Sequence, residues 1–371
     1  MLAHVNRQEM LVLASQAAKA APKSAGTQAE AIKGIHLEAD SRRSMLTLTA
    51  TNYEVAIRTS MAASVEESGS CVVSDSLLPA VLSKLPEEDV DLEIGENGRL
   101  TICSGDSRFR LDVIPGEKYP MPELPFPDDT LPVSGLCSLA RSTVFAAAED
   151  ATQMPQMKCI QLLIGPEGLT ASASNGFCVM QADGDKACRG HSELLLPAHS
   201  LKVLASISKD SDVYEMGLAG KSLVFWSGTL LFSARLMEGR FPEIGRLLEQ
   251  FKGQYSVHLD ADELRHAIES VAAVAEQNAR IELAFGEHEI TLSAESSFGR
   301  SSAPVKALVL SAPAKPFYYN YKKLLEYLSL AKGKITLEFD PSGLLAIRPG
   351  STRYLQSPMR PPTRAASGKA A

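Results

Sequence analysis

The feature that most constrains the fold is a strand-like pattern that the sequence repeats three times. The pattern begins at positions 46, 169 and 290, and in each copy apolar or β-branched residues alternate with hydroxyl-bearing ones. Such alternation is typical of a strand with one buried face. A second alternating run, which begins at 35, 160 and 281, precedes each copy at nearly the same distance. Two linked signals in constant phase indicate an internal repeat of about 120 residues.

The length of the chain supports the same division. Its 371 residues exceed what one hydrophobic core usually serves, and a third of that length is close to the commonest domain size. We therefore expect three domains, at 1–125, 126–250 and 251–360, and a disordered tail at 361–371. The first boundary is the clearest, because six prolines between positions 115 and 132 predict a stiff linker.

Within each predicted domain the pattern indicates two amphipathic helices and several strands. Hairpins are expected at 90–102, around Gly98, and at 213–226. The expected helices cover 7–21, a segment opened by Ser74, 135–149, 197–208, 260–276 and 320–332. The predicted fold class is therefore α+β: two helices on strongly β sheets, built three times.

Composition favours an ordinary globular protein of the cytosol. Apolar residues make up 45% and charged residues 22% of the chain, no apolar run is long enough to span a bilayer, and Met1 to Glu9 lacks the apolar core of a signal peptide. The six cysteines could pair, but they are scattered without metal-type spacing, so buried thiols are the better interpretation. We expect a cytoplasmic location.

The sequence offers no constellation typical of an enzyme. Its seven histidines are isolated, and none has a metal-ligand spacing. Gly217 to Ser222 resembles the end of a phosphate-binding loop, but Glu215 stands where glycine is needed and a strand-like run follows, so a hairpin turn is expected. We therefore predict no catalytic residue, no metal site and no cofactor.

Basic residues recur on the predicted helices. The net charge of the chain is −7, which argues against nucleic-acid binding by the whole surface. Basic helices on an acidic protein instead predict one concentrated positive surface, which would contact phosphates without reading bases. The residues assigned to this surface are Lys19, Lys23, Lys84, Arg141, Lys202, Lys209, Arg265 and Lys322.

Several motifs together resemble a known family. These are the segment 48–54 (LTATNYE), the segment 104–111 (SGDSRFRL) with Tyr119-Pro120 after it, the segment 239–246 (GRFPEIGR), and Pro358-Met359-Arg360 near the end. In order and spacing the chain resembles the bacterial DNA polymerase III β subunits, the sliding clamps, over essentially residues 1 to 360.

The resemblance implies a function without catalysis. Clamps of this family are head-to-tail dimers that close a ring of six similar domains around duplex DNA, with helices lining the hole. The resemblance therefore implies DNA, the polymerase III catalytic subunit, a clamp loader, other motif-bearing peptides and a second copy of the chain as partners, and no membrane. A mobile tether cannot use base contacts, because each would create a local energy well.

The resemblance also implies a peptide pocket between the second and third domains, where partners insert a short apolar motif. Matched position by position, its wall would consist of Ser174, Gly176, Phe177, Val179, Pro242, Arg246, Leu247, Asn320, Lys323, Pro358, Met359 and Arg360. The chain departs from the family where Phe177-Cys178 replaces a His-Arg pair and where polar Gln356 and Ser357 precede the terminal motif. An altered partner affinity or preference is expected from the Phe177-Cys178 change.

At the ring-closing edge the resemblance places Phe109 and Leu111 against Ala272 and Ala273. The family has bulky apolar residues at the two alanine positions, so a weaker dimer is expected unless neighbouring residues compensate. DNA-contacting positions of the family fall near Gly26, Gln153 and Met154, which carry no positive charge. These departures leave a second interpretation open: a divergent clamp-like protein that binds partners but closes its ring weakly. An enzyme acting on DNA or nucleotides is a distant third.

Overall fold

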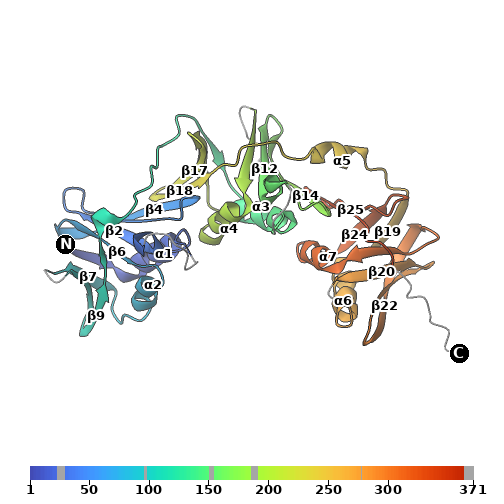
Figure 1. Cartoon of the computed structure of the whole chain (residues 1–371), viewed down its shortest axis with the longest axis horizontal. Coiled ribbons are helices and arrows are strands. Elements are labelled where there is room, and N and C mark those ends of the chain that lie inside the picture. The colour runs from blue at the N-terminus through green and yellow to red at the C-terminus, as the bar shows by residue number, and fades with distance from the viewer. Residues whose placement is uncertain (23–29, 96–97, 150–153, 185–190, 277, 363–371) are drawn as a thin grey trace. The chain divides into compact units, whose positions relative to one another are not determined.

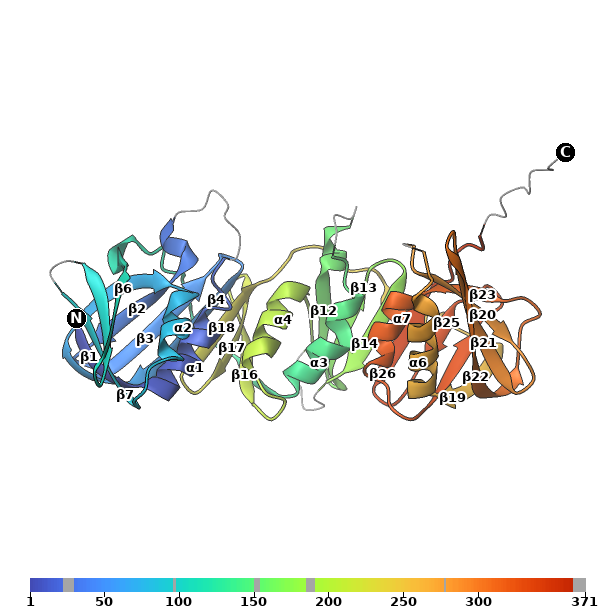
Figure 2. The same cartoon turned by 90° about the horizontal axis from the view of Figure 1, so that it is seen from below.

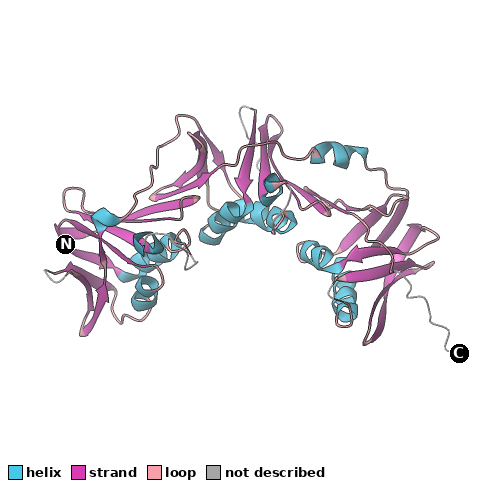
Figure 3. Cartoon of the chain, viewed as in Figure 1, coloured by secondary structure: helices cyan, strands magenta, loops and turns pink. Residues whose placement is uncertain are grey.

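The computed structural model describes residues 1–22, 30–95, 98–149, 154–184, 191–276 and 278–362 (Figure 1). The chain divides into two compact units, each built from two stretches of sequence. Unit 1 comprises Met1–Cys137 and His199–Met237, and unit 2 comprises Ser138–Ala198 and Glu238–Ala371. Both combine large antiparallel sheets with a few short helices (Figure 3). The predicted α+β class is confirmed.

Unit 1 contains two sheets. The smaller has the strand order β5-β1-β7-β8-β9, with β5 at Ser64–Glu67, β1 at Leu2–Asn6, β7 at Asp89–Ile94, β8 at Arg99–Ser104 and β9 at Ser107–Asp112. The larger has the order β10-β6-β2-β3-β4-β18-β17-β16-β11. Its strands are β10 (Ile114–Pro115), β6 (Gly69–Ser74), β2 (Gly34–Asp40), β3 (Met45–Thr51), β4 (Val55–Ala62), β18 (Leu230–Arg235), β17 (Ser222–Ser227), β16 (Tyr214–Ala219) and β11 (Thr130–Val133).

The helices of unit 1 are α1 (Arg7–Ala17), α2 (Leu77–Leu82) and α4 (Ala198–Ile207). Helix α1 begins where the Asn6 side chain accepts the backbone N–H of Glu9 at 3.0 Å, because an N-cap satisfies donors that have no partner within the helix. Its Met10, Leu13, Ala14 and Ala17 side chains are buried. The Gln16 side chain donates to the Ile207 carbonyl at the end of α4. These helices lie on the same face of the larger sheet (Figure 3).

Unit 2 is organised around one twelve-stranded arrangement, in which the long strand β22 pairs with β19 near one end and with β21 near the other. In spatial order the strands are β15 (Ser192–Pro197), β12 (Cys159–Gly165), β13 (Gly168–Ser174), β14 (Cys178–Asp183), β26 (Thr352–Gln356), β25 (Leu345–Ile347), β24 (Lys334–Phe339), β19 (Tyr255–Asp260), β22 (Gly299–Ser311), β21 (Glu289–Ser296), β20 (Arg280–Phe285) and β23 (Phe317–Asn320).

Unit 2 contains α5 (Ile244–Gln250), α6 (Ala261–Ala272) and α7 (Tyr321–Leu328), together with α3 (Leu136–Thr143) from Ser138 onward. Side-chain caps begin two of them: Asp260 accepts two backbone N–H groups at the start of α6, and Asn320 accepts that of Lys322 at the start of α7. Figure 2 shows α6 and α7 side by side. Beneath α7, Tyr327 and Tyr354 stack with ring centroids 4.6 Å apart.

The repeat itself is confirmed as structure. The three copies of the pattern form β3, β13 and β21, and the preceding runs form β2, β12 and β20, each paired antiparallel with its neighbour. The two predicted hairpins are also present, as β7 with β8 and β16 with β17. The loop-like Gly217 to Ser222 is the turn of the second hairpin, where Gly220 takes φ 61°.

Several predicted boundaries were wrong. Most helices are shorter than expected: α1 ends at Ala17, α6 at Ala272 and α7 at Leu328. Ser76, not Ser74, precedes α2, although the Ser74 hydroxyl does accept the N–H of Leu77. Helix α5 was not predicted; it begins within the 239–246 motif and ends at Gln250.

The predicted division into three domains stays a prediction. The larger sheet of unit 1 continues from β4 into β18, and the sheet of unit 2 continues from β14 into β26. Strands assigned to the middle domain are therefore shared between the two compact units. No helix in the described ranges is both long and apolar enough to cross a membrane.

Candidate functional site

A tight turn between β13 and β14 forms the base of the candidate peptide pocket in unit 2. The Asn175 side chain accepts the backbone N–H groups of Phe177 and Cys178, both at 2.9 Å. The Ser174 hydroxyl donates to the Cys178 carbonyl at 3.0 Å and accepts the N–H of Gly176 at 3.1 Å. Gly176 adopts φ 85°, a left-handed conformation that glycine takes without a steric penalty. Local side chains thus fix the turn.

The segment that follows β26 is held against this turn by backbone hydrogen bonds. Strand β26 pairs with β14, and beyond it Ser357 donates its N–H to the Phe177 carbonyl at 2.8 Å. Met359 then donates to the Tyr318 carbonyl on β23 at 2.7 Å. These bonds place the 357–360 segment between the turn and β23, with Met359 half-buried.

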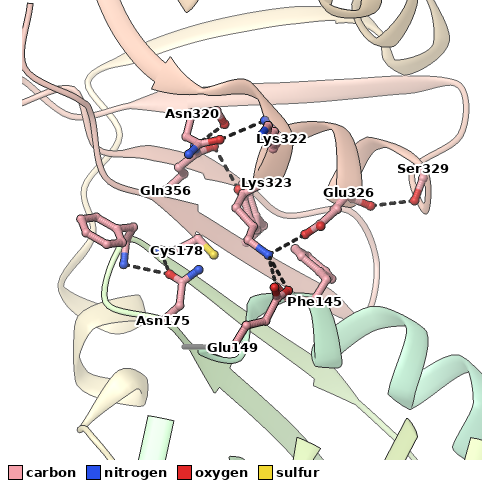
Figure 4. Close-up of polar contacts among 12 residues, drawn as sticks. Phe145, Glu149, Asn175, Cys178, Asn320, Lys322, Lys323, Glu326, Ser329 and Gln356 are labelled. Atoms are coloured by element: carbon pink, nitrogen blue, oxygen red, sulfur yellow. Dashed lines mark hydrogen bonds and ion pairs between the residues drawn. The ribbon is translucent and has the colours of Figure 1, made fainter. Parts of the chain in front are cut away.

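Gln356 links the same segment to α7 from inside. Its side chain is 2% exposed, donates to the Asn320 carbonyl at 2.8 Å and accepts the Tyr354 hydroxyl at 2.9 Å (Figure 4). The amide of Gln356, a polar residue where the family tends to be apolar, is therefore buried with its hydrogen bonds satisfied inside the unit.

Lys323 is anchored from several directions. Its ammonium group lies 2.8 Å from the Phe145 carbonyl, 2.9 Å from a Glu326 carboxylate oxygen and 3.6 Å from one of Glu149 (Figure 4). Burial opposes its charge, but the hydrogen bond and charge of Glu326 outweigh this and raise the pKa of Lys323. Lys323 therefore acts as a positively charged brace, and the two glutamates that hold it were missed. Glu326 could have been found as the i+3 partner on one helix face.

The predicted wall residues fall into two groups. Those of the turn and of the final segment are joined by the hydrogen bonds above; Val179 and Ser174 are buried there, and the Phe177 ring stays 75% exposed. Pro242 lies two residues before the start of α5, which carries Arg246 and an exposed Leu247. Arg246 lies 3.6 Å from Glu243. The place of this second group in the pocket stays a prediction.

The basic residues predicted to contact DNA lie on or next to the helices of each unit. In unit 1, Lys19 and Lys84 follow α1 and α2, and Lys202 and Lys209 lie on and after α4; all four are exposed. In unit 2, exposed Arg141 and Lys322 lie on α3 and α7, whereas Arg265 on α6 is partly buried and pairs with Asp262 at 2.8 Å. Lys23, like Gly26 and Gln153, lies outside the described residues.

The residues assigned to ring closure lie on an edge strand of unit 1 and at the end of a helix of unit 2. Phe109 and Leu111 alternate along β9, which is the edge strand of the smaller sheet in unit 1. In unit 2, Ala272 ends α6 and Ala273 is exposed beside a surface hollow that Phe298 also lines. The Phe298 ring is 98% exposed. A large apolar side chain thus accompanies the two small ones.

The chemistry available along the described chain is limited. No three His, Cys, Asp or Glu side chains among the placed residues are grouped so that they could hold a metal ion. Burial raises the pKa of the Cys71 and Cys178 thiols to about 12 and that of Cys159 to about 11. Such thiols are poor nucleophiles at neutral pH. Of the five described cysteines, all but Cys103 are buried, as expected. Cys188 lies outside the described residues.

Comparisons with known proteins agree along the chain. Residues 1–125 match the family "DNA polymerase III beta subunit, N-terminal domain". A beta sliding clamp of Streptomyces coelicolor is 28% identical over 96% of this chain and 98% of its own length. A beta sliding clamp of Staphylococcus aureus is 25% identical over 82% of this chain and 84% of its own length. Among solved structures, a DNA polymerase sliding clamp of Bacillus subtilis (20% identity, TM-score 0.87) covers 97% of this chain, and 99% of that chain is matched. The structure of a DNA polymerase III β subunit of Thermotoga maritima (19% identity, TM-score 0.88) matches 98% of this chain over 100% of its own length.

Proposed function

Because the chain belongs to the DNA polymerase III β-subunit family, we propose that it is a sliding clamp that encircles duplex DNA and tethers the replicative polymerase. The observation that carries the proposal is the match to a beta sliding clamp over nearly the whole of both chains. We propose that the protein catalyses no reaction and works in the cytoplasm. Its role would be to keep a polymerase on its template.

The helices of each unit provide the proposed DNA-facing surface. Exposed lysines and arginines on them, such as Arg141 and Lys202, would attract phosphates without sequence preference. Since the chain carries net charge −7, this attraction has to come from a local surface. Binding through phosphates alone leaves no deep energy well, so a closed ring could slide.

Retention on DNA of two topologies tests the proposal. The protein is incubated with nicked circular plasmid, a bacterial clamp-loader complex and ATP, and is then passed over a sizing column in high salt, where simple phosphate contacts are screened. We expect the chain to stay on the circle and to leave when the plasmid is linearised. Equal retention on both DNAs, or none on the circle, would contradict a topological clamp.

A charge-reversal pair tests the surface. The double variant Arg141→Glu, Lys202→Glu should reduce loading on the circle at least tenfold, because each change replaces an attraction to phosphate by a repulsion. The control Arg42→Glu reverses an exposed charge in the turn between β2 and β3, away from the helices, and should load normally. If both variants load poorly on the circle, loading depends on the net charge of the protein and not on the helix surface.

Ring closure is proposed to join β9 of one copy to the α6 and β22 side of another, with Phe109 and Leu111 as anchors. Sedimentation at low protein concentration measures the dimer, and Phe109→Ala should raise its dissociation constant by at least tenfold. The small, exposed Ala273 favours the second candidate function, a clamp-like protein with weak closure. A chain that stays monomeric yet binds partner peptides would support that candidate.

The unit 2 pocket is proposed to receive the short apolar motif of the polymerase, the clamp loader and other partners. Met359 is half-buried and its backbone is held to Tyr318, so truncating its side chain should leave the frame in place. We expect Met359→Ala to weaken binding of a motif peptide at least tenfold while the dimer persists. Unchanged peptide affinity would show that the pocket lies elsewhere.

A further inference from the structure

The first repeat covers part of its sheet with an aromatic side chain that stands directly before a proline. Tyr119, which precedes Pro120, is 5% exposed. Its ring centroid lies 5.4 Å from that of His36 on β2, and its hydroxyl accepts the N–H of Thr51 on β3 at 2.9 Å. The Tyr119 ring therefore acts as a plug over β2 and β3.

A glycine begins the turn that brings this plug back to the sheet. Strand β10 pairs with β6, and a short 3₁₀ helix, Gly116–Lys118, then leads to Tyr119. A Cβ atom at Gly116 would collide with the side chain of Ser70 on β6. The chain can lie this close to β6 only because glycine has no side chain.

The second repeat carries an equivalent plug. Phe241, which precedes Pro242, is 6% exposed. It follows Gly239, which adopts φ 134° and lies against the side chain of Gln156, just before β12. Two of the three repeats thus bury an aromatic side chain that stands before a proline and two or three residues after a glycine.

The strand register fixes the equivalent place in the third repeat. In the first repeat, one residue from each of four neighbouring segments forms a row across the sheet: Ile114, Val72, His36 and Thr49. In the third repeat, the backbone bond of the segment after β26 and the strand pairing give the corresponding row: Met359, Tyr318, Glu282 and Ser293. Tyr119 comes five residues after Ile114, so its equivalent in the third repeat is Arg364.

A cavity of about 730 Å³, here called the third-repeat cavity, lies at this place. Its lining includes Glu282 and Ser293 of the row, and Glu295, which is two residues beyond Ser293 as Thr51 is two beyond Thr49. Thr51 is 1% exposed beneath the Tyr119 ring, whereas Glu295 is exposed. The place that the plug covers in the first repeat is therefore open in the third.

The third repeat does not have the residues that make a plug. Pro361 stands at the position of Gly116, and Pro362 lines the third-repeat cavity. Proline has a Cβ atom and a fixed φ, so it does not replace a glycine that lies against a neighbouring strand. At the next three positions, where the first repeat has Lys-Tyr-Pro, the chain has Thr363, Arg364 and Ala365.

Charge does not select the occupant of the third-repeat cavity. Its lining carries three glutamates and two arginines, Glu276, Glu282, Glu295, Arg280 and Arg300. Arg280 already donates to the carbonyl of Arg360 at 3.5 Å. The selection comes from the repeat, because the first two repeats bury an aromatic residue before a proline at this point of the motif. A cavity of this volume has room for both residues.

We propose that the third-repeat cavity binds a partner protein through a segment in which tyrosine or phenylalanine stands directly before proline. The aromatic ring lies over Glu282 and Ser293. A tyrosine hydroxyl accepts the N–H of Glu295, as that of Tyr119 accepts the N–H of Thr51. This site is separate from the peptide pocket at the turn between β13 and β14, and it does not depend on the proposed clamp function.

The experiment uses the full chain and two peptides, acetyl-Gly-Glu-Lys-Tyr-Pro-amide, which copies residues 116–120, and acetyl-Gly-Glu-Lys-Ala-Pro-amide. Hydrogen exchange read by mass spectrometry locates binding, because an occupied third-repeat cavity slows exchange in residues 293–297. We expect the tyrosine peptide to protect 293–297 at a concentration at least tenfold lower than the alanine peptide. Equal protection by both peptides, protection of 174–179 alone, or none at millimolar peptide overturns the proposal.

A graft tests the same fit within the chain. It copies residues 116–120 onto the equivalent positions through Pro361→Gly, Pro362→Glu, Thr363→Lys, Arg364→Tyr and Ala365→Pro. The matched control has the same changes except for Arg364→Ala.

Without any peptide, exchange in 293–297 should be at least tenfold slower in the graft than in the control, because the tethered ring has a high effective concentration. The graft should also lose the protection that the tyrosine peptide gives to wild type. Equal exchange in the graft and the control overturns the proposal. Neither DNA nor a second copy of the chain takes part in these measurements, so their outcome is distinct from that of the proposed function.

Discussion

The turns at 51–55 and 174–178 share a hydrogen-bonded frame and differ in almost every outward side chain. A hydroxyl residue and an asparagine satisfy the same backbone groups in both. The left-handed position, however, holds Tyr53 in one and Gly176 in the other. The comparison teaches that the repeat preserves what the backbone requires, while the side chains that face solvent are free to define different binding sites.

The largest expected effect tests whether the two frames are equivalent. Asn52→Ala and Asn175→Ala each remove the acceptor of two backbone N–H groups, and each should lower the free energy of unfolding by about 2 kcal/mol. Urea unfolding measures both. Asn175→Asp keeps an acceptor and should cost much less. A large loss at one turn and none at the other would break the equivalence.

A smaller effect should follow from exchanging the left-handed residue. In Gly176→Tyr the new Cβ meets nothing within 4 Å, so the destabilisation comes from backbone strain. The variant also restricts the unfolded chain, which offsets part of that strain, and the free energy of unfolding should fall by about 1 kcal/mol. The same unfolding measurement applies. Gly176→Asn should cost less, because asparagine tolerates this conformation. A neutral Gly176→Tyr would remove the argument that Tyr53 is strained.

The smallest effect concerns alkaline pH. Tyr119 is buried, and its hydroxyl oxygen accepts the N–H of Thr51 at 2.9 Å, whereas the corresponding motif of unit 2 has Phe241. Burial raises the pKa of Tyr119 to about 12. The stabilisation that depends on its neutral form is complete below pH 10 and is lost as the pH rises toward 12.

Tyr119→Phe should therefore have a lower free energy of unfolding than wild type at pH 8. As the pH rises, the free energy of unfolding should fall less in this variant than in wild type. The gap between the two proteins in free energy of unfolding should narrow by about 0.8 kcal/mol by pH 10.5. Other tyrosines titrate equally in both proteins, so the difference isolates Tyr119. A gap that stays constant from pH 8 to 10.5 would contradict the raised pKa.

Much of the candidate site followed from residue patterns. The strands came from alternation, and the turn residues Ser174 and Gly176 came from the family likeness. The roles of Gln356 and Lys323 did not follow from such patterns, because they depend on partners far away in sequence: Gln356 is buried against Asn320, and Lys323 is held by Phe145 and Glu149. No local pattern reports such partners. Helix lengths were overestimated because helix formers continue past the last buried turn.

The sequence by itself determined the repeat, the α+β class, the antiparallel pairing of neighbouring strands and the placement of basic residues on or next to helices. These properties depend on local periodicity, which short stretches of chain carry. Only the tertiary structure decided that β18 crosses the turn at Glu54, that β26 crosses the turn at Phe177, and that Tyr53 faces a cavity. Pairing between distant strands is selected by the fit of whole surfaces, since no single residue along either strand specifies its partner.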